Sequence, residues 1–187
     1  MNTFETVNMD RNQVILVDEN DNAIGVMDKL LAHQNGGQRH RAFSIFILNN
    51  KDEILLQRRA STKYHAASLW SNTCCSHPEP EEDTKVSAHR RLKEELCLDI
   101  EELHHIGRIE YKAGVGNGLT EWEIDHLFLG KYHDQPIKPN PLEVSDTCWL
   151  PINTLLSKLK KEPKHFTPWL SFMLPSLQQG LNRTHVK

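Results

Sequence analysis

A thiol and an imidazole lie two residues apart in the segment from Asn72 to Glu79, as Cys75 and His77. A thiol can donate a proton or act as a nucleophile, and an imidazole can bind a metal ion or transfer protons. Pairs of carboxylates follow along the chain, at positions 94 and 95 and at positions 121 and 123. This combination of residue types predicts a metal-dependent active site.

The second carboxylate pair and three histidines form a candidate ligand set. Residues two apart on a strand face the same side, so Glu121 and Glu123 can direct two carboxylates to one point, where they repel unless a cation or proton lies between them. His33 and His40 flank a glycine loop, and His77 could add a third imidazole. Five such ligands suit an octahedral first-row ion better than a tetrahedral structural zinc. The alternative is a solvated edge strand and ordinary surface histidines.

Charged residues on a predicted helix and in a basic cluster also have two interpretations, one structural and one functional. Arg91 shares a helix face with Glu95, and Arg90 with Glu94. These are either surface ion pairs, worth about 0.3–0.5 kcal/mol each, or one carboxylate binds Mg²⁺ while one guanidinium binds phosphate. A single glutamate is sufficient because Mg²⁺ also takes phosphate oxygens. A basic cluster before the Cys75 loop could bind a diphosphate or remain solvated; it consists of Arg58, Arg59 and Lys63.

Hydrophobic periodicity predicts the elements that must position these residues. We expect strands over 13–18, 23–27, 42–48, 53–59, 104–112, 122–132 and 147–150, and helices over 28–33, 84–96, 152–160 and 168–178. Asp83 is the expected N-cap of the second helix, whose buried stripe would be Val86, Leu92 and Leu96. A polar loop over 60–73 carries Trp70, and a flexible glycine-rich loop spans 114–118. Strands mixed with a few helices indicate an α/β or α+β layered fold.

Length and charge limit the classes of protein. A chain of 187 residues predicts one domain over 1–187, and a net charge of -3 predicts no partner among nucleic acids or membranes. Residues 1–5 lack the features of a secretory signal, and no apolar stretch is long enough to span a bilayer. The four cysteines suit reduced thiols in a cytoplasmic protein better than a disulfide framework.

With these residues established, the chain resembles a Nudix protein with a modified signature. The spacing of the Nudix signature is kept from Ser76 to Leu98, through Glu82, Arg90, Glu94 and Glu95. Ser76 and Cys97 replace its two glycines, and Arg91 replaces the first glutamate of its helix. The last change removes an acidic group with which Nudix hydrolases hold Mg²⁺. It therefore argues against pyrophosphate hydrolysis.

The Cys-Ser-His-Pro sequence before that signature is similar to type I isopentenyl-diphosphate delta-isomerases, and the similarity extends from Asp28 to Trp169. It implies a Nudix-like mixed β-sheet sandwiched between helices. It also implies 1,3-allylic isomerisation of isopentenyl diphosphate to dimethylallyl diphosphate, in the synthesis of isoprenoid precursors. The implied partner is this small-molecule diphosphate, bound by a monomer, with a dimer as the alternative.

The resemblance assigns roles to individual residues. The metal ligands would be His33, His40, His77, Glu121 and Glu123, holding Mn²⁺, Mg²⁺ or Zn²⁺, while Glu95 would hold Mg²⁺ on the diphosphate. The catalytic residues would be Cys75, Glu123 and Tyr111. Contacts to the diphosphate would come from Lys29, Arg59, Lys63 and Arg91, and Trp169 would cover the hydrocarbon tail.

The reaction itself explains this choice of residues. Protonation of an unactivated alkene forms a tertiary carbocation or a species close to it, and a second group must remove a proton at the far carbon. We expect Cys75 and Glu123 to be these two groups, and the sequence leaves open which one donates first. The aromatic face of Trp169, or that of Trp70, would stabilise the cation. For Trp70, core packing is the preferred interpretation. The glycine segment and the C-terminal helix are candidate lids that exclude water.

Two other functions remain as alternatives. One is a Nudix hydrolase acting on a nucleoside diphosphate derivative, against which Arg91 argues. The other is a Nudix-fold binding module without catalysis, which would not need Cys75, His77 and Glu123 together.

Overall fold

The computed structural model describes residues 12–184. Residues 1–5, on which the expectation of no secretory signal rests, lie outside this range. The elements follow one another as β1 (Gln13–Val17), β2 (Ala23–Asp28), α1 (Lys29–His33), β3 (His40–Leu48), β4 (Glu53–Arg59), β5 (Trp70–Ser71), β6 (Cys74–Ser76), α2 (Thr84–Leu96), β7 (Leu103–Gly116), β8 (Leu119–Lys131), β9 (Val144–Pro151), α3 (Ile152–Lys161), the 3-10 turn η2 (Pro163–His165) and α4 (Leu170–Thr184).

The strands form one mixed sheet around β3. Strand β3 runs parallel to β8, from His40 opposite Glu123 to Leu48 opposite Lys131. It also pairs antiparallel with β1, β4 and β6, while β8 forms a long antiparallel hairpin with β7 and β9 pairs with β4. A parallel pair needs a long crossover connection between its strands, and here the chain returns through β4, β6 and α2.

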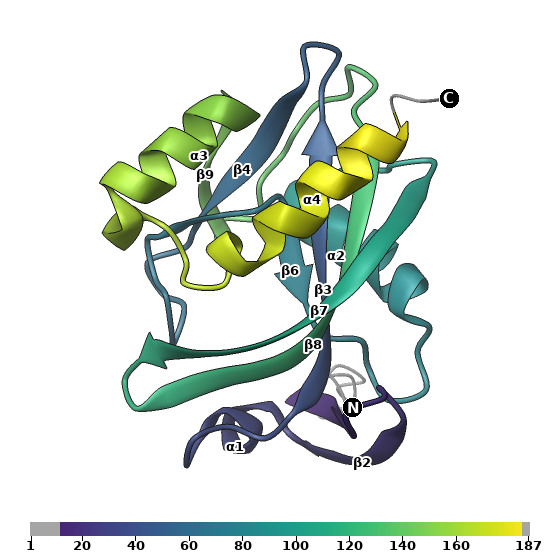
Figure 1. The fold of residues 1–187 in the computed structure, drawn as a ribbon, viewed down its shortest axis with the longest axis vertical. Coiled ribbons are helices and arrows are strands. Elements are labelled where there is room, and N and C mark those ends of the chain that lie inside the picture. The colour runs from purple at the N-terminus through teal and green to yellow at the C-terminus, as the bar shows by residue number, and fades with distance from the viewer. Residues whose placement is uncertain (1–11, 185–187) are drawn as a thin grey trace, which may run out of the picture.

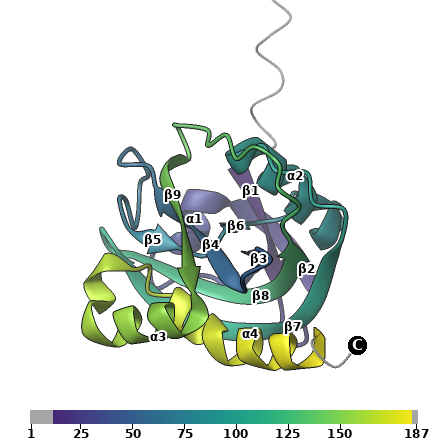
Figure 2. The ribbon, with the colours of Figure 1, turned by 90° about the horizontal axis from the view of Figure 1, so that it is seen from above.

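Helices cover both faces of this sheet, α2 on one and α3 and α4 on the other (Figures 1 and 2). The alternation of β3 explains the two layers, because successive side chains of a strand point to opposite faces. Ile45 and Ile47 pack with Leu92 and Leu96 of α2. Phe46 packs on the other face with residues of α3 and α4. The predicted mixed sheet sandwiched between helices is confirmed.

Helix α2 begins and ends as its sequence dictates, although its buried face differs by one residue from the prediction. The Asp83 carboxylate accepts hydrogen bonds from the backbone N–H groups of Lys85 and Val86, at 2.9 and 3.0 Å. The buried stripe comprises Ala88, Leu92 and Leu96, one helical turn apart, whereas Val86 is 59% exposed. Val86 was therefore assigned wrongly, because it lies two residues, or about 200°, from Ala88 around the helix.

The predicted flexible glycine loop is mostly strand. Gly114 and Gly116 belong to β7, where they pair with Thr120 and Leu119. Only Asn117 and Gly118 form the turn, with φ angles of 52° and 71°. Two consecutive residues with positive φ match the twist of a tight hairpin, and an Asn-Gly pair adopts them readily. This glycine-rich segment therefore extends the hairpin instead of interrupting it.

Two short strands, β5 and β6, were not predicted. They are only two and three residues long.

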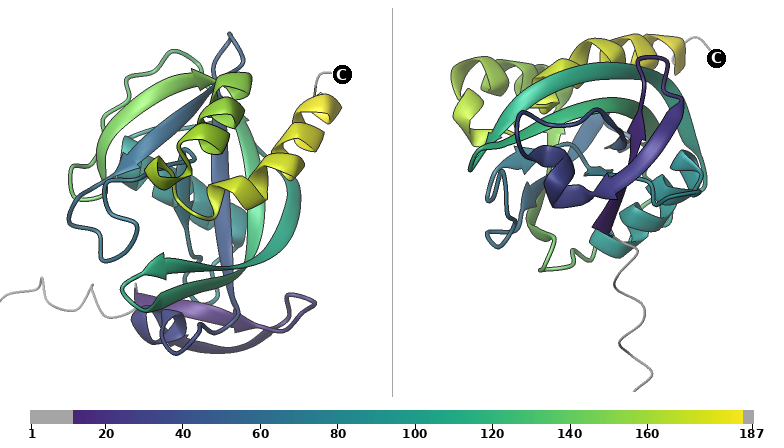
Figure 3. Two further views of the ribbon diagram at one scale, coloured as in Figure 1. Left: turned by 60° about the vertical axis from the view of Figure 1, so that its left-hand side comes forward. Right: turned by 90° about the horizontal axis from the view of Figure 1, so that it is seen from below.

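At one end of the molecule, α1 lies beside the strongly curved β7–β8 hairpin (Figure 3). None of the helices within residues 12–184 combines the length and apolar character needed to cross a membrane.

Candidate active site

A cavity brings together residues that are far apart in the sequence. It is bounded by α1, the loop after β4, β6, α2 and the β7–β8 hairpin. All of the residues predicted to be catalytic or to bind substrate line it: Lys29, Arg59, Lys63, Cys75, Arg91, Tyr111, Glu123 and Trp169. In particular, Cys75 and Glu123 face the same cavity, as two groups acting on one substrate must.

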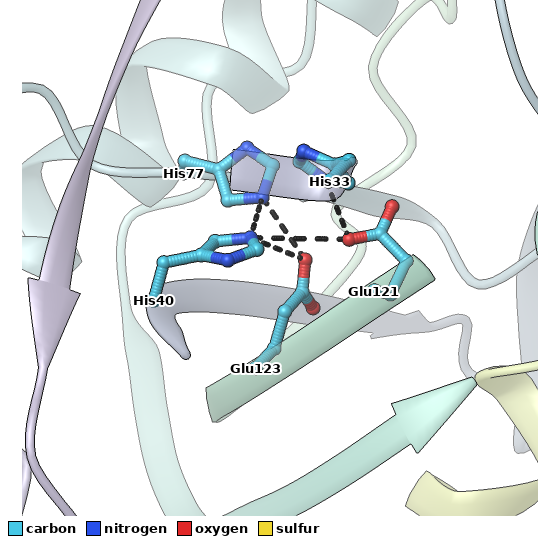
Figure 4. A group of neighbouring side chains, drawn as sticks. All are labelled: His33, His40, His77, Glu121 and Glu123. Carbon is cyan, nitrogen blue, oxygen red and sulfur yellow. Dashed lines mark hydrogen bonds and ion pairs between the residues drawn. The ribbon is translucent and has the colours of Figure 1, made fainter. Parts of the chain in front are cut away.

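The predicted metal ligands form one cluster (Figure 4), and three of them, His77, Glu121 and Glu123, also line the cavity. Their candidate ligand atoms all lie within 4.8 Å of one another; the residues are His33, His40, His77, Glu121 and Glu123. His33 ends α1, His40 begins β3, and the glutamates lie on β8 with both carboxylates on one face. The parallel register of β3 and β8, which places His40 opposite Glu123, is what assembles the cluster.

Backbone carbonyls fix the orientation of two of these imidazoles. His33 donates from Nδ1 to the carbonyl of Lys29 at 2.5 Å, and His40 donates from Nδ1 to the carbonyl of Gln38 at 2.7 Å. In the neutral rings, the lone pair is then on Nε2. That of His33 faces Glu121 Oε2 at 2.7 Å, and that of His40 faces Glu123 Oε1 at 3.4 Å. Lone pairs that face carboxylate oxygens repel, so this geometry requires a cation or a proton between them.

Burial strengthens this requirement. It lowers the pKa of His33, and it lowers the pKa of His77 well below its usual value, so that neither ring readily supplies the positive charge itself. Burial and the neighbouring Glu123 carboxylate raise the pKa of Glu121 well above its usual range. For Glu123, burial also works against ionisation, but the adjacent imidazoles of His40 and His77 hold its pKa well below the usual value. Histidine nitrogens and carboxylate oxygens that converge in this way fit a divalent first-row ion.

Glu123 belongs to the cluster and also lines the cavity. Its Oε1 lies 2.9 Å from His77 Nε2, while its Oε2 accepts a hydrogen bond from the Tyr111 hydroxyl. Strand pairing explains this contact, because Tyr111 lies opposite Glu123 in the β7–β8 hairpin. Burial raises the pKa of Tyr111 well above its usual value, so the phenol stays protonated and acts as a donor.

Cys75 and Cys74 point to opposite faces of β6, as neighbours on a strand do. Cys74 packs among the apolar side chains beneath α2, whereas Cys75 lines the cavity. Burial raises the pKa of Cys75 to about 12, with Arg59 opposing the shift. The Cys75 thiol is therefore protonated at neutral pH and holds a proton that it can donate.

This raised pKa predicts slow alkylation of Cys75. Thiol alkylation requires the thiolate, so at pH 8 iodoacetamide should modify the exposed Cys97 well before Cys75. The rate at Cys75 should continue to rise with pH up to about pH 12, where the folded protein allows the measurement. Peptide mapping by mass spectrometry, with fragmentation to separate Cys75 from Cys74, gives both rates. Equal rates at pH 8 would contradict a protonated, buried Cys75 thiol.

Four cationic side chains also line the cavity, and they are called the cationic wall: Lys29, Arg59, Lys63 and Arg91. Arg91 Nη2 lies 2.7 Å from Glu95 Oε1 and 3.2 Å from Glu143 Oε1, and Lys63 also pairs with Glu143. Burial and the nearby Lys63 lower the pKa of Lys29. A diphosphate in this part of the cavity could pair with Lys29, Lys63 and Arg91.

The two helical ion pairs differ in their surroundings. Glu95 is 4% exposed and also accepts a hydrogen bond from Gln57 Nε2 at 3.1 Å, so its pair with Arg91 is not a surface feature. Arg90 binds Glu82 at 2.7 Å and approaches Glu94 only to 3.4 Å. The surface interpretation therefore applies to Arg90 alone. Of the basic cluster, Arg58 donates to the carbonyl of Ser68 and does not line the cavity, unlike Arg59 and Lys63.

Trp169 forms the apolar wall of the cavity. It is buried, and its indole N–H donates to Ser71 Oγ at 3.2 Å, which fixes the ring. The guanidinium of Arg59 lies 5.3 Å from the ring centroid. Trp70 does not line the cavity and packs at the edge of the core between the sheet and α3 and α4, in agreement with the preferred interpretation.

Comparison with known proteins gives the family. A model of the NUDIX domain matches residues 38–170. Isopentenyl-diphosphate Delta-isomerase 1 of Aromatoleum aromaticum is 48% identical over 158 residues, covering 84% of this chain and 88% of the relative. The corresponding isomerase of Pectobacterium atrosepticum is 44% identical, covering 84% of this chain and 86% of the relative. The chain belongs to the isopentenyl-diphosphate Delta-isomerase family.

Solved structures place this isomerase in the Nudix fold. The crystal structure of DR0079 from Deinococcus radiodurans superposes with a TM-score of 0.72 and 17% identity, covering 87% of this chain and 97% of that one. A MutT protein from Methanosarcina mazei gives a TM-score of 0.61 and 19% identity, covering 80% and 96%. At these identities the likeness shows the fold alone, and the family follows from the sequence relatives.

Several polar residues in or near the cavity were not predicted. Glu143 pairs with Lys63 and Arg91, and His65 and Tyr64 line the cavity. Asp125 lies outside the cavity lining and accepts a hydrogen bond from Ser44 Oγ at 2.9 Å. The spacing of Asp125, which continues the alternation of Glu121 and Glu123, could have revealed it. For His65 the only signal was the high number of histidines, 11 in the chain.

Proposed function

We propose that Cys75 and Glu123 are the acid–base pair with which this isomerase converts isopentenyl diphosphate to dimethylallyl diphosphate. The observation that carries the proposal is that the Cys75 thiol and the Glu123 carboxylate line one cavity, together with cationic side chains and Trp169. Burial raises the pKa of Cys75, while the imidazoles of His40 and His77 outweigh burial and lower the pKa of Glu123. The reaction forms one C–H bond at the terminal methylene carbon and breaks one at the carbon next to the diphosphate-bearing methylene. One group of the pair donates the first proton and the other accepts the second.

The cationic wall would hold the diphosphate. Lys29, Arg59, Lys63 and Arg91 supply the positive charges, and Glu95 would hold Mg²⁺ on the diphosphate oxygens. This remote binding energy positions the hydrocarbon part against Cys75, Glu123 and Trp169. Because the diphosphate is fixed at one wall, the reacting carbons are held within reach of both groups.

A second divalent ion, Mn²⁺, Mg²⁺ or Zn²⁺, would bind at the His33, His40, His77, Glu121 and Glu123 cluster and supply positive charge beside Glu123. Tyr111 holds the other oxygen of that carboxylate, so that Glu123 keeps one orientation during proton transfer. Trp169 stabilises the developing cation through its aromatic face and excludes water that would quench it. The partner is thus a small-molecule diphosphate, and we place the reaction in the cytoplasm, with the enzyme acting as a monomer.

Incubation with isopentenyl diphosphate in deuterated water tests the reaction. We expect dimethylallyl diphosphate that carries deuterium in a methyl group, with label also appearing in residual substrate because the proton transfers are reversible. Product without deuterium would contradict protonation from a solvent-exchangeable group. A parallel incubation with a panel of nucleoside diphosphate derivatives should release no phosphate, and release at a comparable rate would favour the hydrolase alternative.

A further inference from the structure

A fourth histidine adjoins the metal cluster without belonging to it. His65 lies in the loop between β4 and β5, is 5% exposed, and lines the cavity. Its Nε2 lies 3.2 Å from Glu121 Oε1. Its Nδ1 is buried and has no hydrogen-bond partner among the described residues. It is not one of the five residues whose candidate ligand atoms converge.

The two glutamates of the cluster are held in the same way. Glu123 directs Oε1 to the imidazoles of His40 and His77, while Oε2 accepts from the Tyr111 hydroxyl. Glu121 directs Oε2 to His33 at 2.7 Å, while Oε1 faces His65 Nε2. Each carboxylate thus has one oxygen toward the cluster and one held by a donor, and His65 has for Glu121 the place that Tyr111 has for Glu123.

Such a donor is needed because the terminal torsion of a glutamate is broad and does not fix the carboxylate plane by itself. Carboxylates that bind metals are commonly held by a hydrogen bond to a second residue. We propose that His65 is a positioning residue of the metal site, whose Nε2–H holds Glu121 Oε1 so that Oε2 is directed at the cation. This inference rests on the proposed metal site.

Backbone hydrogen bonds also hold the loop that carries His65. The carbonyl of His65 accepts a hydrogen bond from Arg59 Nη2 at 3.3 Å, and the carbonyl of Tyr64 accepts one from Asn117 Nδ2 at 3.0 Å. Lys63, two residues earlier, lines the cationic wall. The His65 side chain therefore holds the loop that carries Lys63 against the strand that carries Glu121. In this way it connects the metal cluster to the cationic wall.

Metal affinity, measured without substrate, tests this role. Mn²⁺ is titrated calorimetrically into the metal-free full chain, in the absence of diphosphate so that the Glu95 site is not completed. We expect His65→Ala to weaken binding by about 10- to 100-fold, the range typical when a residue that orients a metal ligand is lost. His65→Gln should stay within a few-fold of the parent, because its amide can place an N–H near the position of Nε2. His165→Ala is the control, since that side chain is 68% exposed, pairs with Glu162, and belongs neither to the cluster nor to the cavity lining.

The variants separate positioning from other effects. Retention of parent affinity in His65→Ala would overturn the proposal, as would equal losses in His65→Ala and His65→Gln, which would assign the effect to the ring itself. Thermal unfolding of the metal-free proteins shows whether either substitution disturbs the fold. His33→Ala should abolish binding. If His33→Ala still binds Mn²⁺, or if the parent binds none, the metal site is wrong and so is this role for His65. If His33→Ala abolishes binding, the comparison of His65→Ala with His65→Gln decides the role of His65.

Discussion

Replacement of Cys75 by alanine should reduce isomerisation of isopentenyl diphosphate by about 10³–10⁴-fold, a rise of roughly 4–5.5 kcal/mol in the barrier. The reason is that the alkene must exchange protons with two groups, and the Cys75 thiol, whose burial raises its pKa, is the proposed partner of Glu123 in the cavity that both line. The loss should appear in kcat, with little change in the affinity for the diphosphate, because Cys75 does not belong to the cationic wall. Steady-state rates with saturating Mg²⁺ measure it.

The Cys75→Ala protein should remain folded. Cys75 lies on the short strand β6 opposite Ser44 of β3, and alanine keeps the backbone pairing. A stability loss of about 1 kcal/mol is expected, as for an average substitution, and thermal unfolding checks it. Cys97→Ser, at the exposed end of α2, is the matched control and should keep the parent rate. Turnover by Cys75→Ala at the parent rate would overturn the acid–base pair.

Replacement of Glu123 by glutamine should have an effect of similar size, about 10³–10⁴-fold on kcat. Glutamine has the same shape but cannot accept a proton to become an acid, so Glu123→Gln removes the second member of the pair. It also removes one negative charge from the metal cluster, which should weaken Mn²⁺ binding, because Glu123 Oε1 faces both His40 and His77. Rates measured at saturating Mn²⁺ separate the two effects, and the loss in kcat should persist there.

Two further variants serve as comparisons for the effect of Glu123→Gln on kcat. Tyr111→Phe removes only the hydrogen bond to Glu123 Oε2 and should lower kcat less than Glu123→Gln does. Glu110→Gln changes an exposed carboxylate on β7 that pairs with Arg39, and it should leave kcat unchanged. If saturating Mn²⁺ restored the rate of Glu123→Gln, the carboxylate would be a metal ligand alone and would not transfer protons.

Local patterns predicted most of the secondary structure. Alternation and continuous apolar runs gave β1 to β4, and the N-cap at Asp83 and the helical period gave α2, because these features act over a few residues. They did not give β5 and β6, which are too short to carry a pattern and form because β4 and β3 offer them edges to pair with. The Asn117-Gly118 turn was present in the sequence and was interpreted as flexibility instead of as a hairpin.

The sequence by itself determined the family and the residue types of the site, because motif spacing within β6, α2 and β8 needs no knowledge of how those elements pack. Only the tertiary structure decided which groups meet. His33 and Glu121 are 88 residues apart, and their contact depends on α1 packing beside β8. The alignment of His40 with Glu123 depends on the parallel register of β3 and β8. His65 and Glu143 lie in loops without a motif, and only long-range packing places them against Glu121 and Arg91.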